Sequence, residues 1–248
     1  MRAGVVVIGN EILSGKYADE NGAYLIKELR TLGVELARID VIPDDVEEIA
    51  DAVPRHAGRY DVVFTSGGVG PTHDDVTMAG IALGFATRVV RHPELEELLR
   101  AHYKEKTTEG HLRLADVPEG SELDWAPDPS GWPPRGKWPV VRFKNVYILP
   151  GVPSLFRRKF IAIRERFRTG PFYTARVYVV ADEASIAATL DRVVAAHPAI
   201  AFGSYPRIED GYRVVLTIES HDLEATGAAA QALATALGTL VVRVEEPT

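Results

Sequence analysis

The apolar run AGVVVIG at residues 3–9 constrains the fold of this chain more than any other feature. It is rich in β-branched residues and has no polar face, which is typical of a strand buried on both sides in a parallel sheet. Two further strands are expected at 35–42 and 61–66, and patterns with helical spacing lie between them. This alternation over residues 1–168 predicts an α/β protein with a mainly parallel sheet and helices on both of its faces.

Turn and capping residues indicate where the helices begin and end. Gly33 stands where a helix C-cap is expected. Asp44 has Glu47 three residues later, as in a capping box, and Asp74 is the expected cap of the helix after the third strand. The expected helices are 19–32, the one that opens at 43–45, 75–84, 92–106 and 153–168, and short strands are expected at 140–143 and 146–149.

The segment 169–174 is the best candidate for a domain boundary. After it, the patterns follow the order strand, helix, strand, strand, helix, strand, which is the ferredoxin-like βαββαβ arrangement. We therefore expect two domains, residues 1–170 and residues 172–248. The segment 118–139 holds all three tryptophans and is predicted to be an irregular but ordered loop with a short strand.

Composition narrows the classes of function. The net charge of -7 disfavours a protein whose main ligand is a nucleic-acid backbone. The absence of cysteine excludes disulfides, zinc–thiolate sites, iron–sulfur clusters and cysteine nucleophiles. No apolar run approaches the ~18 residues of a membrane-spanning helix, and the first residues lack the form of a signal peptide, so a cytoplasmic protein is expected.

Ligands of parallel sheets bind outside the carboxyl ends of the strands. Three segments follow expected strands directly, at 9–15, 43–45 and 66–75. All three carry acidic residues, and the first and third also carry glycines. The sequence contains no GxGxxG, GxxxxGK[ST] or GxSxG motif, which disfavours a nicotinamide dehydrogenase, a P-loop NTPase and a classical serine hydrolase.

The segment SGGVGPTHDD, at residues 66–75, is the strongest chemical signal. Its glycines leave backbone amides free to point at a ligand, and the helix that follows adds the positive end of its dipole. Together these groups form a nest that suits phosphate. The plain alternative is a tight turn between a strand and a helix, which the glycines alone would also explain.

Pairs of acidic residues lie next to this nest. Asp74 and Asp75 would repel an anionic ligand unless a hard cation such as Mg²⁺ lay between them and the phosphate oxygens. Asp44 joins them only if the sheet brings its loop alongside. The plain alternative for each pair is acids that cap a helix start or are solvated there. The basic run at 157–159 could face phosphate but is expected on a solvated surface, and His73 could contact phosphate but is expected to be incidental in an exposed loop.

These motifs resemble the molybdopterin-binding (MoaB/MogA-like) domain family, and within it the CinA-type branch, which includes the N-terminal domain of eukaryotic FAD synthetases. The resemblance covers most of residues 1–168, and its most specific part is the 66–77 motif. It implies a three-layer αβα fold, followed by the small 172–248 domain of that branch. The matching motifs are IGNEILSG at 8–15, then Asp19 and Asn21, VIPDD at 41–45, SGGVGPTHDDVT at 66–77, ADVPEG at 115–120 and LPGVP at 149–153.

The resemblance implies metal-dependent hydrolysis of a nucleotide pyrophosphate bond, with ADP-ribose the typical substrate and Mg²⁺ or Co²⁺ the cofactor. Asp44 and Asp75 would be catalytic and would hold the metal together with Glu11 and Asp74. The expected partners are a small-molecule nucleotide or pterin and further copies of the chain in a homo-oligomer, without nucleic acid or membrane. The candidate substrate and phosphate contacts are Gly9, Asn10, Ser14, Ser66, Gly67, Gly68, Gly70, Pro71 and Thr72.

Two other functions would use the same residues. One is adenylyl transfer to molybdopterin, which in the wider family involves the carboxylates that match Asp44 and Asp75. The other is nucleotide or pterin binding without catalysis. It is suggested by the segment 129–134 around Trp132, which matches the Asn-Pro-x-Gly-x-Ala-Pro motif of the branch only loosely. Ser66, where Thr is usual, is another departure from the branch. The amidase domain of longer relatives, which deamidates nicotinamide mononucleotide, is not expected in this chain.

Overall fold

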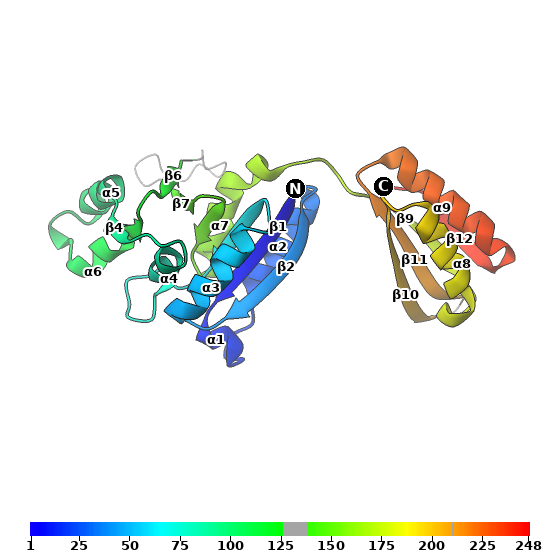
Figure 1. Ribbon diagram of the computed structural model, residues 1–248, viewed down its shortest axis with the longest axis horizontal. Coiled ribbons are helices and arrows are strands. Elements are labelled where there is room, and N and C mark those ends of the chain that lie inside the picture. Colours follow the sequence, from blue (N-terminus) through cyan, green and yellow to red (C-terminus); the bar gives the residue numbers. More distant parts are fainter. Residues whose placement is uncertain (126–137, 210) are drawn as a thin grey trace. The chain divides into compact units, whose positions relative to one another are not determined.

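The computed structural model describes residues 1–125, 138–209 and 211–248, so the predicted loop at 118–139 lies mostly outside the described residues. The described chain forms two compact units, Met1–Thr169 and Gly170–Thr248 (Figure 1). No helix in the described ranges is both long and apolar enough to cross a membrane.

The first unit is built on a six-stranded sheet with the order β2-β1-β3-β8-β7-β6. The first four of these strands are parallel to one another, and β7 and β6 complete the sheet with antiparallel pairs. A separate antiparallel pair is formed by β4 and β5. The strands are β1 (Arg2–Ile8), β2 (Glu35–Ile42), β3 (Val62–Ser66), β4 (Val89–Arg91), β5 (Asp116–Pro118), β6 (Glu122–Asp124), β7 (Val140–Phe143) and β8 (Val146–Leu149).

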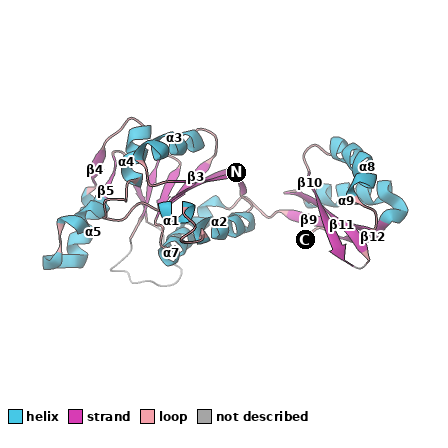
Figure 2. Ribbon diagram, turned by 90° about the horizontal axis from the view of Figure 1, so that it is seen from below, coloured by secondary structure: helices cyan, strands magenta, loops and turns pink. Residues whose placement is uncertain are grey.

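Helices cover both faces of this sheet, with α2 and α7 on one side and α3 and α4 on the other (Figure 2). The α-helices of the unit are α1 (Asn10–Leu13), α2 (Glu20–Thr31), α3 (Val46–Ala57), α4 (Thr77–Gly84), α5 (Pro93–Tyr103), α6 (Glu109–Leu112) and α7 (Pro153–Ile163). Short 3-10 turns follow α5, α6 and α7, at Lys104–Lys106, Arg113–Ala115 and Arg164–Phe167. The predicted three-layer α/β architecture is therefore confirmed.

Alternate residues of β1 pack into two separate hydrophobic cores. Val6 and Ile8 pack with residues of α3, α4 and α5. Val5 and Val7 face the other way and pack with residues of α2 and α7, among them Phe156. Because side chains alternate along a strand, a run that is apolar throughout is required to cover both faces.

Two capping predictions are wrong. Asp45, not Asp44, caps α3, because its side chain accepts hydrogen bonds from the amides of Glu47 and Glu48. Asp74 does not cap α4, which begins after Val76 without a side-chain cap. Both aspartates are thereby available for other contacts. Gly33 has φ +76, as a residue that ends a helix in the left-handed conformation should.

The second unit has the βαββαβ order, and its antiparallel sheet has the strand order β10-β11-β9-β12. Its two helices pack on the sheet around a single apolar core. The first strand meets the end of the chain, where Thr174 and Thr248 exchange backbone hydrogen bonds of 3.2 and 3.3 Å. The elements are β9 (Tyr173–Val179), α8 (Glu183–Ala196), β10 (Ala201–Glu209), β11 (Tyr212–Ser220), α9 (Leu223–Leu237) and β12 (Val241–Glu245).

Candidate functional site

The loops after β1, β2 and β3 meet at one edge of the first unit, because these strands are parallel and adjacent. They border a cavity of about 1220 Å³. The predicted site residues that line it are Glu11, Asp44, Ser66, Gly67, Gly68, Gly70, Asp74 and Asp75. The predicted residues that lie outside its lining are Gly9, Asn10, Ser14, Pro71 and Thr72.

The loop after β3 requires glycine at two positions for steric reasons. Gly67 has φ +106, and a Cβ there would lie 2.0 Å from the carbonyl oxygen of Ile8. Gly68 has φ +62, and a Cβ there would lie 2.4 Å from the hydroxyl of Thr77. That hydroxyl donates to the carbonyl of Gly67 at 2.8 Å, and the Thr77 amide donates to the carbonyl of Gly68 at 3.0 Å. The start of α4 therefore holds the loop in a conformation that only glycine adopts readily.

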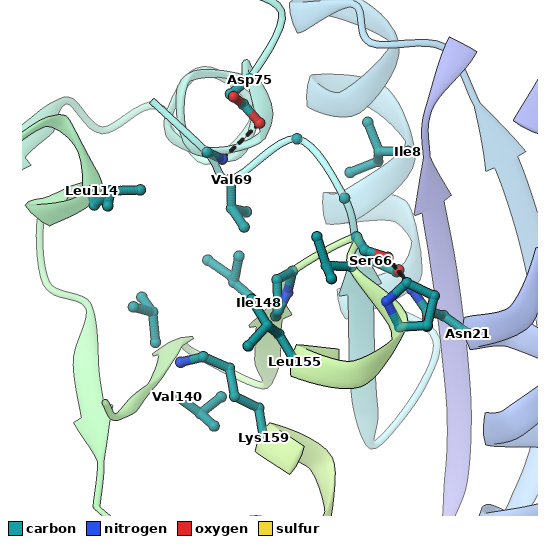
Figure 3. Close-up of a pocket in the computed structure, with 18 of the residues that line it drawn as sticks. Ile8, Asn21, Ser66, Val69, Asp75, Leu114, Val140, Ile148, Leu155 and Lys159 are labelled. Carbon is teal, nitrogen blue, oxygen red and sulfur yellow. Dashed lines mark hydrogen bonds between the residues drawn. The ribbon is translucent and has the colours of Figure 1, made fainter. Parts of the chain in front are cut away.

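Asp75 organises the rest of the loop (Figure 3). Its carboxylate accepts hydrogen bonds from the amide of Gly70 at 2.6 Å and from the amide and hydroxyl of Thr72 at 2.9 and 2.5 Å. The Gly67 amide is also engaged, with the carbonyl of Leu149 at 3.2 Å. In the described chain, no acceptor is recorded for the amides of Gly68 and Val69. Gly68 and Val69 both line the cavity, so their amides are the candidates to meet an anion there, and sequence reasoning missed Val69 because its side chain gives no signal.

Asp74 lies at the solvent side of the same loop. The hydroxyl of Thr72 lies 2.7 Å from its Oδ1 atom and shares its single proton between Asp74 and Asp75, and this contact is the main reason that the pKa of Asp74 lies below the usual value. The neighbouring His73 side chain is 98% exposed and does not line the cavity. The predicted exposed loop position of His73 is confirmed.

The loops after β1 and β2 are joined by Asp44. Its Oδ2 atom accepts a hydrogen bond of 2.7 Å from the amide of Asn10, at the start of the short helix α1. The carboxylate of Glu11 folds back over Gly9, where a Cβ would lie 2.8 Å from its Oε1 atom. Ser14 is exposed and donates to the carbonyl of Glu11 at 3.3 Å. Asp44 and Glu11 thus reach the rim of the cavity, while Ser14 points elsewhere.

Asn21 joins the glycine loop to the loop that precedes α7 (Figure 3). Its amide nitrogen donates to the hydroxyl of Ser66 at 2.9 Å and to the carbonyl of Gly151 at 2.7 Å. Asp19 caps α2 through the amides of Asn21 and Gly22, which fixes the start of this helix. The buried Asn21 side chain therefore sets the position of Ser66 at the cavity wall.

The opposite wall of the cavity is mostly apolar and carries one lysine (Figure 3). Lys159 of α7 donates to the carbonyl of Pro139 at 2.5 Å. Burial lowers the pKa of its ammonium to about 7. The basic run was expected on the surface, but a helix turns about 100° per residue. Arg157 is indeed exposed and pairs with Glu20 at 2.9 Å, whereas Lys159 faces the cavity.

The negative charge of the acidic rim suits a divalent cation, but its carboxylates do not form a complete set of protein ligands. Among the described residues, no Lys or Arg pairs with Glu11, Asp44 or Asp75. Nor do any three His, Asp or Glu side chains in the described ranges converge closely enough to hold a metal by themselves. Mg²⁺ is commonly held by one or two carboxylates together with substrate phosphates and water, and the rim fits that mode.

The fold and the site together define an α/β protein with a glycine-rich loop and carboxylates at the carboxyl edge of its sheet. Residues 4–168 match the family described as probable molybdopterin binding domain, and residues 171–245 match the one described as FAD synthase, middle domain. The chain belongs to the molybdopterin-binding domain family, in its CinA-type branch. The resemblance drawn from the sequence motifs is confirmed.

Individual relatives agree with this assignment. A protein of Archaeoglobus fulgidus is 37% identical over 85% of this chain and 87% of its own length. A probable FAD synthase of Caenorhabditis elegans is 33% identical over 93% of this chain, which spans only 49% of that protein. The crystal structure of the CinA protein of unknown function from Thermoplasma acidophilum is 28% identical, with a TM-score of 0.58, and covers 68% of this chain and 100% of its own.

Proposed function

We propose that the first unit hydrolyses the pyrophosphate bond of a nucleotide such as ADP-ribose, with Mg²⁺ or Co²⁺. One observation carries this proposal: Gly68 and Val69, for whose amides no acceptor is recorded among the described residues, line the same cavity as Asp44 and Asp75. Amides without acceptors attract phosphate oxygens, and carboxylates without counter-ions suit a cation bound to that phosphate.

Each group has a distinct role in the proposed reaction. The amides of Gly68 and Val69 hold one phosphate of the diphosphate, and Asp75 fixes the loop that presents them. A divalent cation held by Asp75, with Asp74 and Glu11 nearby, would neutralise charge on the diphosphate. Asp44 uses Oδ2 on the Asn10 amide, and its Oδ1 accepts a proton from the attacking water. Water adds to one phosphorus, the bridging P–O bond breaks, and AMP and ribose 5-phosphate result.

The test is incubation of the pure protein with ADP-ribose and either metal, followed by chromatography of the products. In ¹⁸O-labelled water, one of the two product phosphates should carry a single labelled oxygen. Absence of AMP with both metals would contradict the proposal. Production of AMP that needs an added acceptor other than water would redirect it to transfer.

A second candidate is adenylyl transfer, which the relatives named probable FAD synthase favour. In this reaction, the phosphate of an acceptor attacks the α-phosphorus of ATP, and pyrophosphate leaves. Molybdopterin and FMN are acceptors of the required kind, since each carries a terminal phosphate. Pyrophosphate release from ATP that depends on one of these acceptors would establish transfer, and release without an acceptor would exclude it as the main reaction.

A further inference from the structure

Lys159 is a cation for which no ionic partner is recorded among the described residues, and it lies on the apolar wall of the cavity. An ammonium carries three N–H donors, and the carbonyl of Pro139 accepts from one of them. A buried charged group is costly unless its hydrogen bonds are completed. The remaining donors therefore indicate a ligand group that lies against this wall.

The position of Lys159 on α7 separates it from the glycine loop. The loop before α7 contacts the glycine loop, since a Cβ on Gly151 would lie 3.2 Å from the Cα of Gly67. Lys159 is six residues beyond Pro153, the first residue of the helix, which amounts to roughly 9 Å along the helix axis. This separation exceeds the size of one phosphate, so Lys159 meets a different part of a long ligand.

The chemistry of the wall indicates which part of the ligand it holds. Val140 and Leu155 lie near Lys159 (Figure 3), and the lining of the same cavity also includes the apolar Leu114 and Ile148 and the aromatic Tyr103 and Trp138. Sugar hydroxyls placed here would lose their hydrogen bonds to water and gain few in return. A flat ring loses little against such a wall, and carbonyl oxygens on that ring would accept from the lysine.

We propose that Lys159 and this apolar wall form a second subsite, which holds the distal ring of a dinucleotide through carbonyl oxygens on that ring. This inference deepens the proposed function and rests on it for the placement of the diphosphate at Gly68 and Val69. The substrate class is then a dinucleotide with a carbonyl-bearing heteroaromatic ring at each end, or at the end opposite adenosine. ADP-ribose fills the phosphate site and leaves the second subsite without a ring.

Proton uptake offers a readout that a merely structural lysine would not give. Besides Lys159, the titratable groups on this side of the cavity that belong to the described ranges are His102, Tyr103, Asp124 and Arg158. Asp124 is paired with two arginines, Arg142 at 3.4 Å and Arg166 at 2.6 Å, and the lowered pKa of Lys159 is caused by burial alone. A ring carbonyl that accepts from the ammonium favours its charged form, so binding above pH 7 should take up a proton.

The experiment compares FAD, whose distal ring bears carbonyl groups, with ADP-ribose, which has none. Binding to the full chain is measured by titration calorimetry with Ca²⁺ in place of Mg²⁺, in two buffers of different ionisation enthalpy at pH 8. Lys159→Met should raise the Kd for FAD by roughly tenfold or more and abolish the proton uptake. The Kd for ADP-ribose should stay within about twofold of the wild-type value. Lys159→Arg should restore part of the FAD affinity. The control Lys27→Met, at an exposed position of α2, should leave the affinities for both ligands unchanged.

Two results would overturn the second subsite: unchanged FAD binding in Lys159→Met, or equal losses for both probes. Failure of the wild type to bind FAD more tightly than ADP-ribose would overturn it as well, even if ADP-ribose is hydrolysed. Conversely, FAD binding that depends on Lys159 without hydrolysis of either compound would support the subsite and contradict the proposed hydrolysis. Circular dichroism of each variant verifies that it is folded.

Discussion

The two walls of the cavity hold charge in different ways. On the glycine-loop wall, Asp44 and Asp75 remain in reach of solvent and accept hydrogen bonds from backbone amides. On the α7 wall, the partner recorded for Lys159 within the described residues is one backbone carbonyl, and burial lowers the pKa of its ammonium to about 7. Hydrogen bonds from amides stabilise the charged form of a carboxylate, whereas poor solvation favours the neutral amine over the ammonium. The carboxylates are therefore held in their charged form in advance, whereas the lysine is only partly charged at neutral pH and a ligand that accepts from the ammonium would complete its protonation.

The largest effect is expected for Asp75→Asn. An Asn side chain cannot accept from Gly70 and Thr72 together as the carboxylate does, and it removes the negative charge that a cation requires. We expect kcat/KM for ADP-ribose to fall at least ~100-fold, in the range seen when a preorganised electrostatic group is removed. Steady-state kinetics with saturating metal measure this, and a loss below threefold would show that the glycine-loop wall does not act in the reaction.

Gly68→Ala tests the shape of the same wall rather than its charge. The positive φ and the 2.4 Å approach to Thr77 should lower the free energy of unfolding by about 1–3 kcal/mol. Displacement of the Gly68 and Val69 amides should raise KM for ADP-ribose by about tenfold. Gly120→Ala is the matched control, because Gly120 has φ +90 but lies outside the cavity with 4.0 Å of room. It should cost stability and leave KM unchanged, and equal KM changes in both variants would contradict the assignment.

The opposite wall is tested through the pH dependence of stability. Lys159 has a pKa near 7 in the folded chain and 10.5 when unperturbed, so the unfolded state binds more protons between these values. The free energy of unfolding should therefore rise with pH from about 7 toward 10, with a contribution of up to ~1.4 kcal/mol per pH unit from this group. Below pH 7 both states are protonated and the penalty is present in full.

Lys159→Met removes this titration and keeps an unbranched side chain of similar length. Chemical denaturation at pH 7 and pH 9 should show a smaller rise for the variant than for the wild type. The variant should also be at least as stable as the wild type at pH 7, since it no longer carries a buried cation. Parallel pH dependences in the two proteins would contradict the buried, ligand-free state of the lysine.

The smallest effects are expected for substitutions at the adjacent residues Asp44 and Asp45, on the glycine-loop side of the cavity. Asp45→Ala removes the cap of α3 and should lower the free energy of unfolding by about 1 kcal/mol without altering turnover. Asp44→Asn should do the reverse, with reduced turnover and little change in stability. Thermal unfolding and kinetics on both variants decide the matter, and an activity loss in Asp45→Ala would assign this neighbour to the site as well.

Much of the fold was accessible from the sequence because its signals are local. The strands at 35–42, 140–143 and 146–149 have the predicted bounds, since β-branched apolar runs between turn residues leave few alternatives. The convergence of Asp44, Gly68 and Asp75 followed from the rule that adjacent parallel strands share a carboxyl edge.

Other features depend on geometry that the sequence does not encode locally. The choice of Asp45 over Asp44 as the cap depends on which residue has the extended backbone before the helix, at φ -134 and ψ 131. Lys159 looked like a surface residue because two arginines precede it, and only the packing of α7 turns it inward. The open amide of Val69 belongs to the backbone, so no side-chain pattern could identify it.

The hydrogen bonds between Thr174 and Thr248 place the first strand of the second unit beside its last residues. Thr174 and Thr248 lie within hydrogen-bonding distance, so insertion of this unit into a host polypeptide would separate the flanking segments by only a few ångströms. Closure of so short a gap costs little conformational entropy. A second unit of this kind could therefore be inserted into a surface loop of another protein with little strain on the chain at either side of it.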